Sequence, residues 1–242
     1  MAISNLFKLT QAERNKFSTL IIDSSAPRVD YYFLVILSTM IVSLGLLADN
    51  IILVIGGMLV TPLLSPILAV ALGIVISETK VIARSFRIML TSFGFALAVS
   101  LVIGFFSRVN IAEISIIQKM EPSLFVFFVA LVAGLAASYT WAKPTMNEAL
   151  PGIAVTVTLI PPLTAIGLTL SHVEWTLFID VLKVLLLNVF GIISASLITF
   201  SMMDFYKAKK KVIEEVKEEE EEIEKEKEKE KEKVKVRNNT KK

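Results

Sequence analysis

Long apolar runs are the feature that most restricts how this chain can fold. Each run has about 18 residues or more, enough to cross the hydrocarbon core of a bilayer as a helix. The six runs are 31–48, 51–76, 86–107, 122–140, 149–170 and 176–203. A content of 54% hydrophobic residues and a mean hydropathy of +0.68 exclude a soluble protein with a single core. We therefore expect an all-α integral membrane protein with six transmembrane helices in contact with the lipid bilayer.

Two of these runs contain prolines where a helix in lipid should avoid them. The second run includes "GGMLVTPLLSPILAVALG", with Pro62 and Pro66, and the fifth includes "TVTLIPPLTAIG", with Pro161 and Pro162. Proline lacks the amide that would bond the carbonyl four residues back, and lipid offers no replacement donor. The carbonyls that a continuous helix would leave unpaired are those of Met58, Pro62, Val157 and Thr158. The pattern predicts that both helices are broken at the prolines.

The two broken runs each stand second in a group of three. "LVTPLLSPILAVALG" and "VTVTLIPPLTAIGLTL" share a Val-Thr, a proline pair, apolar residues and a glycine. Because three crossings are an odd number, the second group must run in the opposite sense to the first. This predicts two inverted three-helix repeats, at 31–107 and 122–203. Interrupted segments in matching positions of inverted halves are typical of a transport site near the bilayer midplane.

Hydroxyl groups beside the prolines are the candidate ligands of such a site. They belong to Thr61, Ser65, Thr158 and Thr164. Together with the freed carbonyls they would suit a dehydrated cation, whereas the helix N-termini after each break would attract an anion. In the alternative, the hydroxyls bond back to the preceding turn and neighbouring helices repair the kinks.

Four further residues are predicted to support the site. Gly56 and Gly57 permit close approach of another backbone, or serve as simple packing contacts. Glu148 precedes Pro151-Gly152, where an acidic side chain stabilises a helix N-terminus. Asn188 places an amide deep in the sixth run, where it needs a hydrogen-bond partner on another helix.

Basic residues between the runs indicate the orientation in the membrane. If the N-terminus is cytoplasmic, twelve basic residues near the ends of the runs lie on that side. The opposite side has three, namely Arg108, Lys119 and Lys183. By the positive-inside rule, we expect a multi-pass cell-membrane protein with both termini in the cytoplasm.

Two cytoplasmic segments flank the membrane domain of residues 31–206. Within residues 1–30, apolar residues recur at helical spacing over 5–22, which indicates a helix on the membrane surface or on the protein's own cytoplasmic face. Residues 207–242 contain 14 of the 25 basic and 12 of the 23 acidic residues. We interpret this Glu/Lys tail as a solvated extension, part helical and part disordered; the alternative is a helix that docks a partner.

Catalytic and cofactor motifs are missing from the sequence. The chain has no cysteine, and its single histidine, His172, lies in a short predicted external loop, so the sequence offers no HExxH zinc motif and no catalytic Ser-His arrangement. No phosphate-binding glycine loop occurs, and the basic residues are not interleaved with aromatics as in nucleic-acid-binding proteins. We expect no enzyme activity, cofactor, metal site or nucleic-acid partner.

The segments at 23–74 and 150–168 also carry a family resemblance. The stretches Gly-Met-Leu-x-x-Pro-Leu-x-x-Pro, from Gly57 to Pro66, and Gly-x-Ala with Pro-Pro-Leu, from Gly152 to Leu163, resemble the prokaryotic membrane family known as domain of unknown function 389. The resemblance covers roughly residues 5–205. It implies a polytopic membrane fold and no established activity. The Glu/Lys tail lies outside it, and the larger soluble domain of some members is not recognisable here.

These observations lead to three functional hypotheses. The first is a transporter or channel-like protein that moves a small solute or ion between the two broken helices. The second is a membrane scaffold or sensor that recruits a cytoplasmic partner through its tail, and the third is an intramembrane enzyme. We also expect a homo-oligomer, because small residues offer close-packing faces to another copy. The residues concerned are Gly45, Gly104, Gly134 and Gly191.

Overall fold

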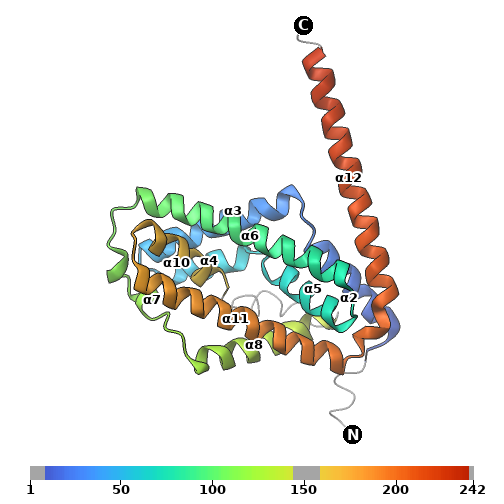
Figure 1. Cartoon of the computed structure of the whole chain (residues 1–242), viewed down its shortest axis with the longest axis horizontal. Coiled ribbons are helices and arrows are strands. Elements are labelled where there is room, and N and C mark those ends of the chain that lie inside the picture. Colours follow the sequence, from blue (N-terminus) through green and yellow to red (C-terminus); the bar gives the residue numbers. More distant parts are fainter. Residues whose placement is uncertain (1–8, 144–158, 240–242) are drawn as a thin grey trace.

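The computed structural model describes residues 9–143 and 159–239. All regular secondary structure within these residues is helical (Figure 1). The α-helices are α2 (Gln11–Ser24), α3 (Val29–Leu47), α4 (Ile51–Val60), α5 (Leu64–Val75), α6 (Thr79–Phe106), α7 (Ser115–Gln118), α8 (Leu124–Ala142), α10 (Ile160–Ser171), α11 (Trp175–Met202) and α12 (Lys209–Asn239). Two short 3₁₀ helices are η1 (Ile111–Glu113) and η3 (Phe205–Ala208).

Four helices are long and apolar enough to cross a membrane, namely α3, α6, α8 and α11. The bent pair formed by α4 and α5 makes a fifth if it counts as one span. These five correspond to five of the six apolar runs. The fifth run is described only from residue 159, where the short apolar helix α10 begins one residue later. Several apolar helices are thus suited to a membrane, as the sequence predicts.

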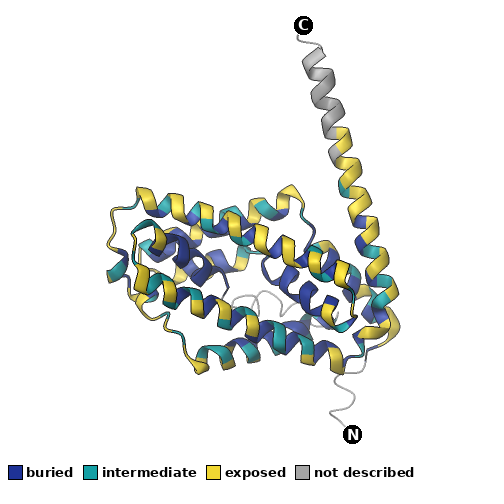
Figure 2. Cartoon of the chain, in the orientation of Figure 1, coloured by how far each residue is buried: buried dark blue, intermediate teal, exposed yellow. Residues whose placement is uncertain are grey.

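The two short helices α5 and α10 form the centre of the bundle. Both are buried on all sides over most of their length, whereas the long helices around them expose one face (Figure 2). The exposed faces are rich in large apolar side chains, including Phe105, Phe106 and Phe125, which are each more than 70% exposed. A surface of this kind suits contact with lipid rather than water.

The helices α5 and α10 start near the middle of the bundle and run to opposite ends (Figure 1). Near its C-terminus, α5 packs Gly73 against Val81 and Ile82 in the first turn of α6. The corresponding end of α10 packs against the last turns of α6, where Ser171 lies against Gly104. One long helix therefore receives α5 on its first half and α10 on its second half.

The turns that follow α5 and α10 have the same backbone geometry. Three residues join α5 to α6 and α10 to α11, and the middle residue, Ser77 or Val173, has a left-handed φ of 53° or 61°. In each turn, the amide of the following glutamate, Glu78 or Glu174, donates to the carbonyl five residues back. Helix lengths also agree: α5 and α10 have 12 residues each, α6 and α11 have 28, and α3 and α8 have 19.

Helix α2 packs on one end of the bundle with η3 and the start of α12. The Phe17 ring centroid lies 5.2 Å from that of Phe200 and 4.7 Å from that of Phe205. The buried Arg14 side chain donates from Nε to the Met203 carbonyl at 2.9 Å. Of the two interpretations of residues 5–22, the structure favours a helix packed on the protein itself, over the part from Leu9 onward.

The charged tail is more closely attached than the sequence suggested. Its helix α12 starts at Lys209 and buries Val212, Val216 and Glu219 against the bundle before it extends away (Figure 1). The prediction of a solvated extension is therefore wrong for these first turns. The reason is that two valines and a glutamate on one helical face find apolar and basic partners on α2 and α6.

The opposite end of the bundle is tied together by Asp49. Its carboxylate accepts the amides of Ser115 at 3.3 Å and Ile116 at 3.0 Å, at the N-terminus of α7. Hydrogen bonds from Ser115 and the Ile116 amide lower the pKa of Asp49. The short turn between α3 and α4 is thereby connected to the segment between α6 and α8.

The four glycines expected to face another copy pack inside the chain instead. Gly45 lies against the Val54 backbone and Gly104 against Ser171. Gly134 and Gly191 bring α8 and α11 into close contact. They are therefore intramolecular packing residues, and the homo-oligomer stays a prediction without their support.

Substituting Gly134 is expected to test this packing. A Cβ at Gly134 would lie 2.8 Å from the Ile192 Cα, so Gly134→Ala must separate α8 from α11 and should cost about 1–3 kcal/mol. Gly94 in α6 has nothing within 4 Å of an added Cβ, so Gly94→Ala should be neutral or gain up to about 1 kcal/mol. Thermal unfolding in detergent compares the two variants. Equal midpoints for both would contradict the described helix contact.

Candidate functional site

The predicted break in the second apolar run is present. Helix α4 ends at Val60, α5 begins at Leu64, and the two axes differ by 53°. Thr61 is extended, with φ −75° and ψ 132°, because the ring of the following Pro62 disfavours a helical conformation for the residue before it. The proline thus ends α4 near the middle of the bundle.

Ser65 satisfies the polar groups on one side of the break. Its Oγ lies 2.8 Å from the Ser24 carbonyl and 2.9 Å from the Pro62 carbonyl. The hydroxyl has one proton, so these two acceptors share it. Pro66 lies in the first turn of α5, where a missing amide costs no intrahelical bond. For Ser65 the structure favours the alternative in which the hydroxyl bonds back to the chain.

Thr61 and Thr164 differ from Ser65. Their hydroxyl oxygens are buried without a hydrogen-bond partner among the described residues, and the whole Thr164 residue is 0% exposed. A buried hydroxyl without a partner costs free energy, so such groups are rare unless a ligand or water satisfies them. Thr61 stands at the break itself and Thr164 near the start of α10.

The prolines of the fifth run lie at the beginning of a helix. Pro161 and Pro162 occupy the first turn of α10, which follows its N-cap Leu159. Their missing amides are among those that have no intrahelical partner at a helix start. Three candidate residues lie outside the described residues, namely Val157, Thr158 and Glu148.

A cavity of about 320 Å³ brings four of the predicted residues together. Met58 of α4, Pro161 and Pro162 of α10, and Asn188 of α11 all line it. The remaining lining residues come from α4, α7, α8, α11 and the segment after α7, and all are apolar except the exposed Lys119. The cavity therefore connects the α7 end of the bundle with the start of α10.

The remaining candidates lie outside the lining of this cavity. They are Thr61, Pro62, Ser65, Pro66, Thr164, Gly56 and Gly57. Gly57 packs tightly on Val42 and the Ser38 carbonyl, whereas Gly56 faces open space. The α3 backbone therefore approaches Gly57 closely, whereas Gly56 is exposed and has no such neighbour among the described residues.

Sequence reasoning did not identify Lys119 or the α8 wall of the cavity. Lys119 served only as a loop charge in the orientation argument, and the apolar residues of α8 carry no motif. The one available signal was that Lys119 is among the three basic residues on the predicted outer side.

Comparison with known proteins agrees with the motifs around the prolines. Residues 58–194, more than half of the chain, match the family described as domain of unknown function, DUF389. This chain belongs to the DUF389 family. The matched DUF389 region starts at Met58 and extends past Asn188, so it includes the break and all of α10.

The DUF389 chain also resembles an uncharacterized protein of Methanocaldococcus jannaschii. The two are 26% identical over 170 residues, which cover 69% of this chain and 52% of the relative. The chain thus spans about half the length of that relative. No solved structure matches it.

Two hydroxyl deletions are expected to have opposite effects in this DUF389 protein. Ser65→Ala removes the donor shared by two carbonyls and should cost about 1–2 kcal/mol of unfolding free energy. Thr164→Val removes a hydroxyl without a described partner, so stability should stay the same or rise by about 1 kcal/mol. Thermal unfolding in one detergent compares them. Destabilisation by Thr164→Val of the same size as by Ser65→Ala would show that its hydroxyl is satisfied within the protein.

Proposed function

We propose that this DUF389 protein is a membrane transporter or channel-like protein with six spans in two inverted repeats. A small solute or ion passes through a midplane site between the half-helices α5 and α10. The observation that carries the proposal is the position of these two helices. They are buried at the centre, begin at prolines near the middle of the bundle and run to opposite ends (Figure 1).

The inverted repeat is supported by matching helices and turns. Helix α10 starts at Ile160, 96 positions after the start of α5 at Leu64. The same spacing separates the start of α11 at Trp175 from the start of α6 at Thr79. The paired helices have equal lengths, and the residues Ser77 and Val173 both have a left-handed φ. In both turns the next amide donates to the carbonyl five residues back. Packing is reciprocal as well, because α5 and α10 each contact both α6 and α11.

The chemistry around the half-helix starts favours a negatively charged group over a cation. The N-terminus of a helix carries a partial positive charge. In the first turns here, Leu64, Ser65 and Ile160 have an amide to offer, whereas Pro66, Pro161 and Pro162 have none. Two such ends lie near the middle of the bundle, and the Thr164 hydroxyl, which has no partner within residues 9–143 and 159–239, belongs to the first turns of α10. The cavity at Met58 leads to Pro161 and Pro162 and has Lys119 among its lining residues. An anion or a carboxylate-bearing solute fits these groups better than the dehydrated cation that the sequence left open.

The orientation part of the proposal places both termini in the cytoplasm. It rests on the twelve-to-three distribution of basic residues. Because the chain has no cysteine, single cysteines can be labelled from one side. Asn50→Cys should react from outside and Lys209→Cys only after permeabilisation. Reaction of both from the same side would contradict the orientation.

A flux panel tests the proposed function. The protein is reconstituted in liposomes that are loaded in turn with inorganic anions, small carboxylates and monovalent cations. We expect flux of at least one anionic solute above that of protein-free liposomes, and none of the cations. No flux of any solute would remove the support for transport.

The scaffold hypothesis is favoured by one observation, the extension of α12 away from the bundle (Figure 1). Shortening the chain after residue 226 removes the extension and keeps the buried Val212, Val216 and Glu219. A transporter should retain its flux in this variant. A scaffold should show no flux in either form and lose its partner on shortening.

A further inference from the structure

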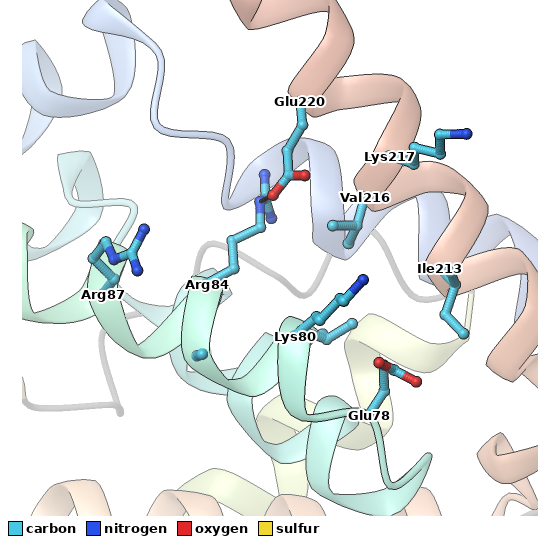
Figure 3. A pocket seen from close by; sticks show the side chains of 10 residues that line it. Glu78, Lys80, Arg84, Arg87, Ile213, Val216, Lys217 and Glu220 are labelled. Atoms are coloured by element: carbon cyan, nitrogen blue, oxygen red, sulfur yellow. Dashed lines mark ion pairs between the residues drawn. The ribbon is translucent and has the colours of Figure 1, made fainter.

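A second cavity lies between the start of α6 and the docked part of α12 (Figure 3). Its volume is about 440 Å³, within the usual range for small-ligand pockets. Arg84 of α6 reaches Glu220 of α12 and Lys80 extends towards the same helix, whereas Arg87 lies further along α6 (Figure 3). Helix α12 contributes Ile213, Val216, Lys217 and Glu220. None of these residues belongs to the proposed transport site.

Positive charge exceeds negative charge in this cavity. The lining residues include four basic side chains and two carboxylates, Glu78 and Glu220. Glu78 also pairs with Lys209 outside the lining, at 3.5 Å. Lys80, Arg87 and Lys217 form no ion pair among the described residues. Three cations are therefore available to a ligand.

Arg84 adds a buried donor that is not satisfied. Its side chain is 10% exposed and pairs through Nη2 with Glu219, while Nε lies 3.9 Å from Glu220. Among the described residues, the buried Nη1 atom has no hydrogen-bond partner, and the same holds for Oε1 of Glu219, so the pair leaves one donor and one acceptor unused. A guanidinium offers five N–H donors in a planar fork, a geometry that matches the oxygens of phosphate. The three basic side chains without ion pairs are the main reason to expect an anionic ligand, and the spare donor of Arg84 adds to them.

The cavity lies at one end of an apolar helix. Lys80, Arg84 and Arg87 occupy the first turns of α6, and the exposed side chains that follow include Phe86 and Leu90. In a membrane-spanning α6, these basic residues would stand at the level of the lipid headgroups, with apolar surface beside them for an acyl chain.

We propose that this cavity binds the phosphate group of an anionic phospholipid headgroup. Lys80 and Arg87 supply the charge, and Arg84 Nη1 donates to a phosphate oxygen. Free inorganic phosphate shares this chemistry and is the alternative source of the ligand. The proposal rests on the membrane location of α6 and not on transport, so a protein that moves no solute can still bind here.

The test uses the full chain and compares lipids by native mass spectrometry and thermal unfolding. Phosphatidic acid carries a phosphomonoester, and phosphatidylcholine is the zwitterionic control. We expect phosphatidic acid to remain bound and to raise the unfolding midpoint of the wild type more than phosphatidylcholine does. Lys80→Gln combined with Arg87→Gln should weaken its binding at least about tenfold, since two charge-assisted contacts are lost.

A matched variant controls for the general loss of positive charge. Arg108→Gln combined with Lys183→Gln removes two charges at the opposite end of the bundle and should leave binding unchanged. Inorganic phosphate in detergent forms the second arm. If inorganic phosphate stabilises the wild type and Lys80→Gln/Arg87→Gln abolishes this effect, the site binds free phosphate. If only the lipid stabilises the protein, the site binds the headgroup. Equal binding of phosphatidic acid by all variants, or no response to either ligand, would overturn the proposal.

Discussion

Replacing Arg84 with leucine is expected to release α12 from the bundle. Glu219 is 3% exposed and its ion pair with Arg84 is the main compensation for its burial. Leucine would leave a buried carboxylate without its cation, a change that costs about 3–5 kcal/mol when the group stays buried. Undocking of α12 returns Glu219 to water, so the loss should appear mainly as detachment of this helix.

Limited proteolysis measures this detachment. Cleavage between Ala208 and Val216, which are buried in the docked form, should become much faster in Arg84→Leu. The double variant Arg84→Leu/Glu219→Leu is the control, because an apolar pair can replace a buried ion pair at little cost. It should regain most of the protection. Equal protease sensitivity of the single and double variants would show that the ion pair does not hold α12.

Filling the cavity at Met58 is expected to abolish most of the flux. Met58→Trp places a larger, rigid side chain in a cavity of about 320 Å³ that leads to the start of α10. We expect flux to fall at least about tenfold, because a solute would lose its path and its place beside the half-helix. The neighbouring Leu59 is 51% exposed and does not line the cavity, so Leu59→Trp should keep its flux.

Thermal unfolding separates blockage from misfolding in this pair. Both tryptophan variants should unfold within a few degrees of the wild type, since the cavity accepts one ring and the lipid-facing surface the other. The proposed path would be contradicted if Leu59→Trp lost its flux while Met58→Trp kept it, or if Met58→Trp showed full flux.

The helical spans and the first break could be predicted because lipid leaves few solutions. A backbone in hydrocarbon must bond internally, so apolar runs of sufficient length become helices and Pro62 interrupts one of them. The same rule predicts a break at Pro161 and Pro162; the structure shows both in the first turn of α10, and the part of the fifth run before residue 159 lies outside the described residues. Apolar runs and prolines act on the backbone of their own segment, so their effects can be predicted without knowledge of the tertiary contacts.

Partners distant in sequence could not be predicted. Ser65 bonds to Ser24, 41 residues away, and Arg84 pairs with Glu219, 135 residues away. Nothing in the repetitive Glu/Lys tail distinguishes Glu219 from its neighbours until α12 docks on α2. The glycines Gly134 and Gly191 likewise could not be assigned to internal packing before α8 and α11 were seen together.

Single-cysteine block of flux tests the central claim most directly. Met58→Cys and Leu59→Cys differ by one position, and the chain has no other cysteine. After reconstitution, a charged, membrane-impermeant thiol reagent is applied and anion flux is recorded. The account predicts that flux through Met58→Cys falls at least about tenfold while Leu59→Cys is unaffected, because only residue 58 lines the path. Modification of Met58→Cys without any change in flux would contradict a path between α4 and α10.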